Sequence, residues 1–342
     1  MRGRMMVLLS VVLILGATVS QGEWTMLVHR GPNVTAFPVS GIDSLTFRDD
    51  TLSVPEMVVV PAGVFIMGDG EAYCGIDQRE VTLTRSFYLG QHEVTNQEYL
   101  EAVQWAYGRG YVRATTTSVW DNLDGSTQEL LDLDGSCEIS FSQGTFTLRD
   151  AGHGINPDHP VMEVTWYGAV RYCDWLSLWA DLPRAYQHTG NWACNGGDPY
   201  GAQGYRLLTD AEREYAAQYD DERIYPWGNE APDCSRANFY YGGYCVGWTS
   251  PVGSYPDAPA VPGLSDMAGN VCEWCNDWHV CSLGTTPATD PVGPSSGAFR
   301  VLRGGSWREL YGAFLRCAIR IGDNPNISYD NVGFRAARTI TP

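Results

Sequence analysis

The last third of the chain is dominated by residues that interrupt regular structure. After residue 219, glycine, proline, tryptophan and asparagine recur so often that few long helices or strands are expected. Irregular backbone must still pair its N–H and C=O groups, and it lacks the ladders that helices and sheets provide. The sequence therefore predicts a fold that depends on additional tethers.

Ten cysteines can supply such tethers if the protein is exported. The N-terminus has the layout of a secretory signal peptide, with two arginines, an apolar run of about a dozen residues and then small residues. The run is too short to span a bilayer. We therefore expect residues 1–21 to be a signal peptide and the mature protein to be secreted or periplasmic, without membrane insertion.

The spacing of the cysteines favours one disulfide. Cys234 and Cys245 flank a glycine-containing loop that closes with little strain, so we expect this pair first. Cys74, Cys137 and Cys194 lie in polar segments and could pair among themselves. Sequence alone leaves their connectivity open.

Charge excludes several classes of function. The chain has 40 acidic residues against 22 basic ones, and its net charge is −18. All the basic residues are arginine, which excludes a Schiff-base lysine and a phosphate-loop lysine. The negative charge opposes binding to nucleic acid and suits an extracellular surface or cation binding.

Local patterns predict an α+β domain preceded by a small module. Residues 22–54 are expected to form an N-terminal module of short strands, and residues 55–342 one large domain. Thr95, Thr165 and Thr209 each begin a helical pattern, and the first and last are followed three residues later by glutamate, which completes a capping box. 

Residues 113–158 are rich in threonine, aspartate, glycine and serine. They include a hairpin pattern, CEISFSQGTFTLRD, and are predicted to form a surface insertion.

The segment GNVCEWCNDWHVC, residues 269–281, concentrates residues that could carry chemistry. Cys272, Cys275, His279 and Cys281 are ligand types that zinc accepts, but they are closely spaced. In a strand, residues three apart point to opposite faces, so disulfides to other segments are favoured over zinc. Nearby, Asp266 and Glu273 bracket a Gly-Asn turn, and carboxylates with backbone carbonyls are the ligands that calcium takes.

Nine blocks between about residues 57 and 338 resemble the sulfatase-modifying factor family, whose founding activity is the formylglycine-generating enzyme. They occur in the family's order. The blocks are VVVPAGVFIMG, YLGQHEVTNQEY, HPVMEVTWYGAVRYCDWLS, GYRLLTDAEREYAAQ, YPWGNEAP, PVGSYP, GLSDMAGNVCEW, RVLRGGSW and NVGFRAAR.

The resemblance implies a fold and a cofactor. The family's fold is α+β with a C-type-lectin-like topology and little regular structure, and family members hold calcium in the loop that matches DMAGNVCE. Carried over, the ligands are the carboxylates of Asp266 and Glu273 and the carbonyls of Gly269 and Val271. A second family site begins at Asn238 and the carbonyl of Phe239, but its later ligands find no match in GGYCVGWT.

The resemblance fails at the catalytic position. The founding enzyme binds copper(I) through two cysteines after its Gly-Gly-Ser-aromatic block, and here Glu309 and Phe314 stand in their places. No copper is therefore expected. The segments that form the family's substrate groove supply the candidate groove residues, which are Ser306, Trp307, Glu309, Arg316 and Arg320.

Two hypotheses about function follow. The first is a secreted, calcium-stabilised binding or accessory domain that recognises a protein, peptide or saccharide through its surface loops. The alternative is an oxidoreductase of the formylglycine-generating or iron-dependent type with a non-standard site, in which reduced Cys272 and Cys275 replace the missing pair.

Overall fold

The computed structural model divides the chain into two compact units, Met1–Thr51 and Leu52–Pro342. The residues that it describes are 16–20, 23–30, 33–38, 52–71, 74, 77–255, 261 and 263–340. Most of the predicted signal peptide therefore lies outside the described residues, and the cleavage site stays a prediction.

The first unit contains one antiparallel sheet. Strand β2 (Glu23–Arg30) lies in the middle, paired with β1 (Gly16–Ser20) on one side and β3 (Asn33–Pro38) on the other. Arg30 is opposite Asn33 in the register, so β2 and β3 are the two strands expected around this turn.

The second unit has short strands in several small sheets. A four-stranded sheet has the order β17-β16-β14-β18, and a second has the order β13-β19-β7-β4. Smaller sheets are β15-β6-β5, β10-β9-β8 and β11-β12. The strands are β4 (Met57–Val60), β5 (Gly63–Met67), β6 (Arg79–Leu83), β7 (Phe87–Gly90), β8 (Val112–Ala114), β9 (Ser118–Asp121), β10 (Glu129–Asp132), β11 (Ile139–Ser142), β12 (Thr145–Leu148), β13 (Tyr205–Leu207), β14 (Cys272–Trp278), β15 (Ala288–Thr289), β16 (Arg300–Arg303), β17 (Arg320–Asp323), β18 (Val332–Phe334) and β19 (Ala336–Thr339).

The three α-helices begin where the sequence predicts. They are α1 (Asn96–Gly108), α2 (Trp166–Trp179) and α3 (Asp210–Gln218). Thr95 and Thr209 form complete capping boxes, and the Thr165 hydroxyl accepts a hydrogen bond from the Gly168 amide. Short 3₁₀ helices lie at Leu123–Gly125, His188–Gly190, Cys194–Gly197, Pro199–Gly201 and Gly312–Leu315.

Between α3 and β14 the described residues contain no helix or strand, as the breaker-rich composition predicts. Among all the residues that the structure describes, no helix is long and apolar enough to cross a bilayer.

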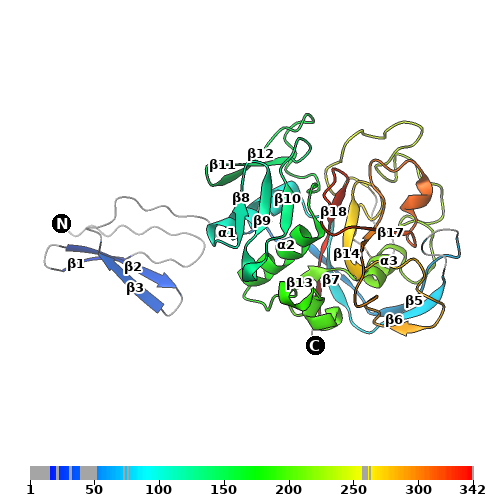
Figure 1. The fold of residues 1–342 in the computed structure, drawn as a ribbon, viewed down its shortest axis with the longest axis horizontal. Helices are drawn as coiled ribbons and strands as arrows, with labels where there is room; N and C mark the ends of the chain where they lie inside the picture. The colour runs from blue at the N-terminus through cyan, green and yellow to red at the C-terminus, as the bar shows by residue number, and fades with distance from the viewer. Residues whose placement is uncertain are drawn as a thin grey trace. The chain divides into compact units, whose positions relative to one another are not determined.

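The sheet β17-β16-β14-β18 has two unlike faces. One, called here the apolar face, carries Trp274, Leu302 and Phe334, and the Phe334 ring packs edge-on against aromatic rings of α1 and α2. The other, called here the charged face, carries Glu273 and Arg303 and is covered by α3. Figure 1 shows α1 and α2 on one side of β14 and β18, and α3 on the other.

The segment 113–158 differs from the expected surface insertion. Its residues Val119, Leu130, Leu131 and Ile139 are fully buried in the main core. Each of its strands is short and half polar, so the composition concealed the apolar residues that pack against α1 and α2.

Candidate functional site

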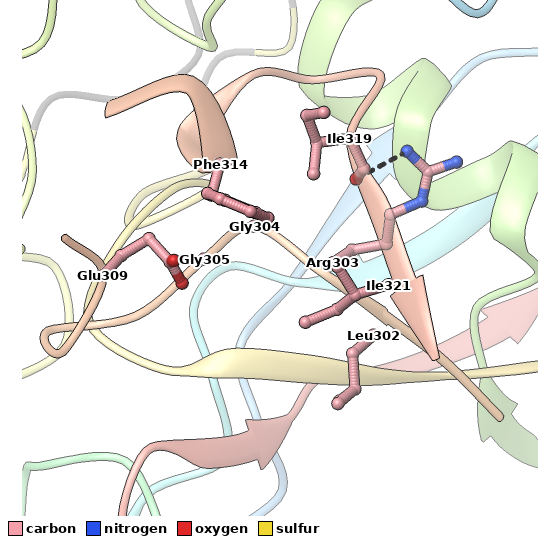
Figure 2. Close-up of a pocket in the computed structure, with 8 residues that line it drawn as sticks. All are labelled: Leu302, Arg303, Gly304, Gly305, Glu309, Phe314, Ile319 and Ile321. Atoms are coloured by element: carbon pink, nitrogen blue, oxygen red, sulfur yellow. Dashed lines mark hydrogen bonds between the residues drawn. The ribbon is translucent and has the colours of Figure 1, made fainter. Parts of the chain in front are cut away.

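A small hollow lies at the end of the apolar face, and the space in it that a water-sized group can enter is about 10 Å³, roughly enough for one water molecule. Glu309 and Phe314, the two residues that by the resemblance are expected in the positions of the family's copper-binding cysteines, both line it. Figure 2 shows the Glu309 carboxylate and the Phe314 ring directed toward Gly304 and Gly305. The remaining lining residues are Leu302, Arg303, Ile319 and Ile321.

The chemistry of this hollow is that of a carboxyl group beside apolar side chains. Burial raises the pKa of the Glu309 carboxyl group above its ordinary value. The Phe314 ring offers no metal-binding atom. The hollow therefore presents one carboxyl acceptor beside apolar side chains, and it lacks the two soft sulfur ligands that copper(I) prefers.

Ser306 and Trp307 are buried beside the hollow and do not line it. The Ser306 hydroxyl accepts a hydrogen bond of 3.0 Å from the Asn331 side chain. The Trp307 indole N–H donates to the Asp330 carbonyl at 2.9 Å. These two hydrogen bonds tie the segment after Gly305 to residues 330 and 331.

The two arginines of the predicted groove lie elsewhere. Arg316 forms an ion pair of 2.7 Å with Asp69. Arg320 is buried on the charged face, where it forms an ion pair with Asp210 of α3. The prediction fails for Arg320 because side chains alternate along β17, so Ile319 and Ile321 point to the hollow and Arg320 points away.

Cys272 and Cys275 do not form a thiol pair. Cys272 lies near Ser306 and Glu309, whereas Cys275 lies near Asp210 and Arg303 on the charged face. Burial raises the pKa of both thiols, which favours the unreactive protonated form. The structure thus gives no support to an oxidoreductase site built from these two residues.

The structure contains two disulfides. Cys234 is bonded to Cys245, the pair that the sequence favoured, and Cys74 is bonded to Cys281. The expectation that the cysteines of segment 269–281 are all cross-linked is wrong for Cys272 and Cys275, which carry no disulfide.

Cys137 and Cys194 are also buried and carry no disulfide, so the pairing that the sequence left possible among them and Cys74 does not occur. Among the described residues, no three histidine, cysteine or acidic side chains are arranged to hold a metal ion, which leaves the zinc alternative without support.

In the predicted calcium loop, the carboxylates of Glu273 and Asp266 already accept hydrogen bonds from protein donors. The Glu273 carboxylate is buried and accepts hydrogen bonds from Arg213 at 2.8 and 3.0 Å and from Arg335 at 3.1 Å. The Asp266 carboxylate accepts from the amides of Gly253 and Tyr255. As arranged, these two carboxylates do not fit a calcium ion, because their oxygens are committed to other donors.

Electrostatics agree with this geometry. Burial alone would raise the pKa of Glu273, but Arg213 and Arg335 hold it below its ordinary value, so the carboxylate stays ionised. Burial raises the pKa of Asp266 to about 6. Burial, and next the charge of Asp266, raise the pKa of neighbouring Glu93 well above its ordinary value.

The second calcium position differs from the first. Asn238 is fully buried, and its Oδ1 atom accepts no hydrogen bond within the described residues. Its backbone carbonyl accepts from the Asn270 amide at 2.9 Å, and the Phe239 carbonyl accepts from Cys245 at 3.0 Å. Gly269 packs against Asn238, so the two predicted positions are neighbours. The Val271 side chain is buried in the small cluster around Trp307.

Sequence reasoning missed Arg213 and Glu93, both of which are almost wholly buried. Arg213 lies in α3, where all nine residues are buried although several are charged. On sequence alone such a helix is expected to keep its charges in solvent. The sequence does carry one signal for Arg213. In TDAEREY three acidic residues surround a single arginine, a pattern that suits a buried network of ion pairs.

Large aromatic side chains are exposed close to the hollow. Tyr241, Tyr244 and Tyr311 are 61%, 54% and 67% exposed. The Tyr244 ring lies 5.7 Å from the buried Trp307 ring, and the Tyr311 ring lies 6.5 Å from the Phe314 ring. We call Tyr241, Tyr244, Leu310 and Tyr311 the aromatic rim.

Comparison with known proteins identifies the family. The model of the sulfatase-modifying factor enzyme 1-like domain matches residues 43–340. The formylglycine-generating enzyme of Mus musculus is 30% identical, over 87% of this chain and 79% of its own.

The serine/threonine-protein kinase Pkn1 of Chlamydia trachomatis is 32% identical over 83% of this chain, which spans only 38% of that kinase. Among solved structures, Treponema denticola variable protein 1 has a TM-score of 0.59 at 24% identity, with 83% of this chain and 95% of that chain covered, which supports the expected fold. The chain therefore belongs to the sulfatase-modifying factor family.

Proposed function

We propose that this protein is a binding or accessory domain of its family and does not perform copper-dependent oxidation. The observation that carries the proposal is the pair of residues in the hollow, Glu309 and Phe314. A carboxyl group and a phenyl ring cannot provide two-coordinate sulfur ligation. Cys272, a thiol that lies near Glu309, is buried and carries no disulfide.

The aromatic rim supports a role in binding. Exposed tyrosines present flat apolar surface with a hydroxyl group at one end, a combination enriched at recognition surfaces. The Cys234–Cys245 disulfide lies in the same loop as Tyr241 and Tyr244 and limits its motion. The rim suits a protein, peptide or saccharide ligand that packs flat against its exposed tyrosines, outside the small hollow.

Export and calcium remain part of the proposal. The N-terminal signal pattern and the two disulfides support an extracytoplasmic location. For calcium, the support lies at Asn238, whose buried Oδ1 accepts no hydrogen bond from the part of the chain that the structure describes, as expected for an oxygen that binds a cation. The carbonyl of Phe239 would be a further ligand there.

Copper(I) affinity tests the main proposal. The protein competes with a chromophoric copper(I) chelator, and the wild type is expected to leave the chelator complex intact. The double variant Glu309→Cys/Phe314→Cys is expected to withdraw copper(I), and the matched variant Glu309→Ser/Phe314→Ser is not. Stoichiometric withdrawal of copper(I) by the wild type would end the proposal.

A further inference from the structure

The loop of residues 265–273 presents a group of inward-facing oxygens that needs a positive partner. Ser265, Asp266 and Met267 contribute backbone carbonyls, and Glu273 contributes a carboxylate. The residues are almost fully buried, so these oxygens cannot rely on water. A calcium ion is one common way to gather carbonyls and a carboxylate around a turn.

Arg335 donates hydrogen bonds to some of these oxygens. Its Nη2 donates to the carbonyl of Ser265 at 3.0 Å, to that of Asp266 at 3.4 Å and to Glu273 Oε1 at 3.1 Å. Its Nη1 donates to the carbonyls of Gly90 and Gln91 at 3.1 and 2.8 Å. One guanidinium group therefore ties the loop to the end of β7.

Arg213 binds the remaining oxygens of this group. Its Nη2 donates to the Met267 carbonyl at 2.8 Å and to Glu273 Oε1 at 3.0 Å, while its Nε donates to Glu273 Oε2 at 2.8 Å. The bidentate contact fixes the plane of the carboxylate. Because Arg213 belongs to α3, this contact ties the same loop to the helix that covers the charged face.

The cluster already contains two cations beside its carboxyl groups. Glu93, Asp266 and Glu273 are its three carboxyl groups, and Arg213 and Arg335 supply two positive charges. A divalent cation placed beside Glu273 would face two guanidinium groups within hydrogen-bond distance of the same oxygens, so it would have to displace at least one.

We propose that Arg213, together with Arg335, takes the Glu273 carboxylate away from calcium in the 265–273 loop of this protein, so that two guanidinium groups hold a carboxylate that the resemblance assigns to the metal ion in its relatives. The proposal concerns this loop alone and does not depend on the proposed binding function or on the Asn238 position. It makes Arg213 a determinant of metal independence within the fold.

The test compares calcium responses of melting temperature in the full chain. Arg213→Met removes one cation and frees oxygens of Glu273 and Met267, and we expect this variant to gain a calcium-dependent rise in Tm of at least about 3 °C over chelator-treated protein. The matched control is Arg206→Met, which breaks an equally buried ion pair with Glu212 and should gain no calcium response.

The wild type supplies the decisive comparison if Arg213→Met does not fold. Any calcium response of the wild type is expected to be unchanged by Glu273→Gln, because calcium does not use Glu273. A wild-type response to calcium that Glu273→Gln removes would overturn the proposal, since it would place the ion on the carboxylate now assigned to the arginines.

Discussion

Removing the Cys74–Cys281 disulfide is expected to destabilise this protein more than removing Cys234–Cys245. The first bond joins residues 207 apart and the second joins residues 11 apart. In the chain-entropy account, the entropy that a cross-link removes from the unfolded state grows with the logarithm of loop length. For these separations the account gives about 5.4 and about 2.8 kcal/mol at 25 °C.

The assay is urea-induced unfolding of two double variants under oxidising conditions. The variants are Cys74→Ala/Cys281→Ala and Cys234→Ala/Cys245→Ala, and their free energies of unfolding should differ by about 2.6 kcal/mol. The control variant is Cys173→Ala/Cys317→Ala, which removes two buried thiols that form no disulfide. It reports the cost of lost packing alone, and it should lose stability on reduction as the wild type does because it keeps both disulfides.

We predict which double variant loses more unfolding free energy, as well as the size of each loss. Equal losses, or a larger loss for the shorter loop, would refute this prediction. Such a result would mean that the disulfides act through native contacts and not through the unfolded chain.

Two further predictions concern single residues. Burial, and then the charge of Asp134, raise the pKa of Glu163 from 4.5 to about 8. The stability that the protonated Glu163 side chain contributes is therefore present below about pH 4.5 and is lost as the pH rises to about 8. Glu163→Gln should therefore raise the unfolding free energy by about 1–2 kcal/mol above about pH 8, allowing for solvent screening, and by much less in acid. Gly269→Ala should cost about 2–4 kcal/mol in urea unfolding, because its φ is +84° and a Cβ would lie 2.7 Å from the Asn238 carbonyl oxygen. Gly284→Ala, at φ +71° with open space around it, should cost about 1 kcal/mol, and equal losses for the two glycines would contradict the steric argument.

Local features were predictable because their causes are local. The capping boxes at Thr95 and Thr209 need only a hydroxyl and a glutamate three residues apart, and both helices begin there. The hairpin of β11 and β12 follows from its alternating pattern. The Cys234–Cys245 bond closes a short loop, which a sequence displays directly.

Long-range features were not predictable in the same way. Cys74 and Cys281 are 207 residues apart, and no spacing rule connects them. The direction of Arg320 depends on the register of β17 against β16, and a shift of one residue would exchange the two faces. The sequence blocks predicted Glu309 and Phe314 at one position, and both line the same hollow. Only the packing of α3 shows that Arg213 reaches Glu273.

The central claim is that the family's fold persists here without its oxidative chemistry. The most direct measurement is mass spectrometry of a cysteine-containing sulfatase peptide after incubation with the purified protein, copper and oxygen, beside an active formylglycine-generating enzyme. We expect the peptide to keep its cysteine with this protein and to be converted only by the control enzyme. Turnover of the peptide to formylglycine by the wild-type protein would contradict the account.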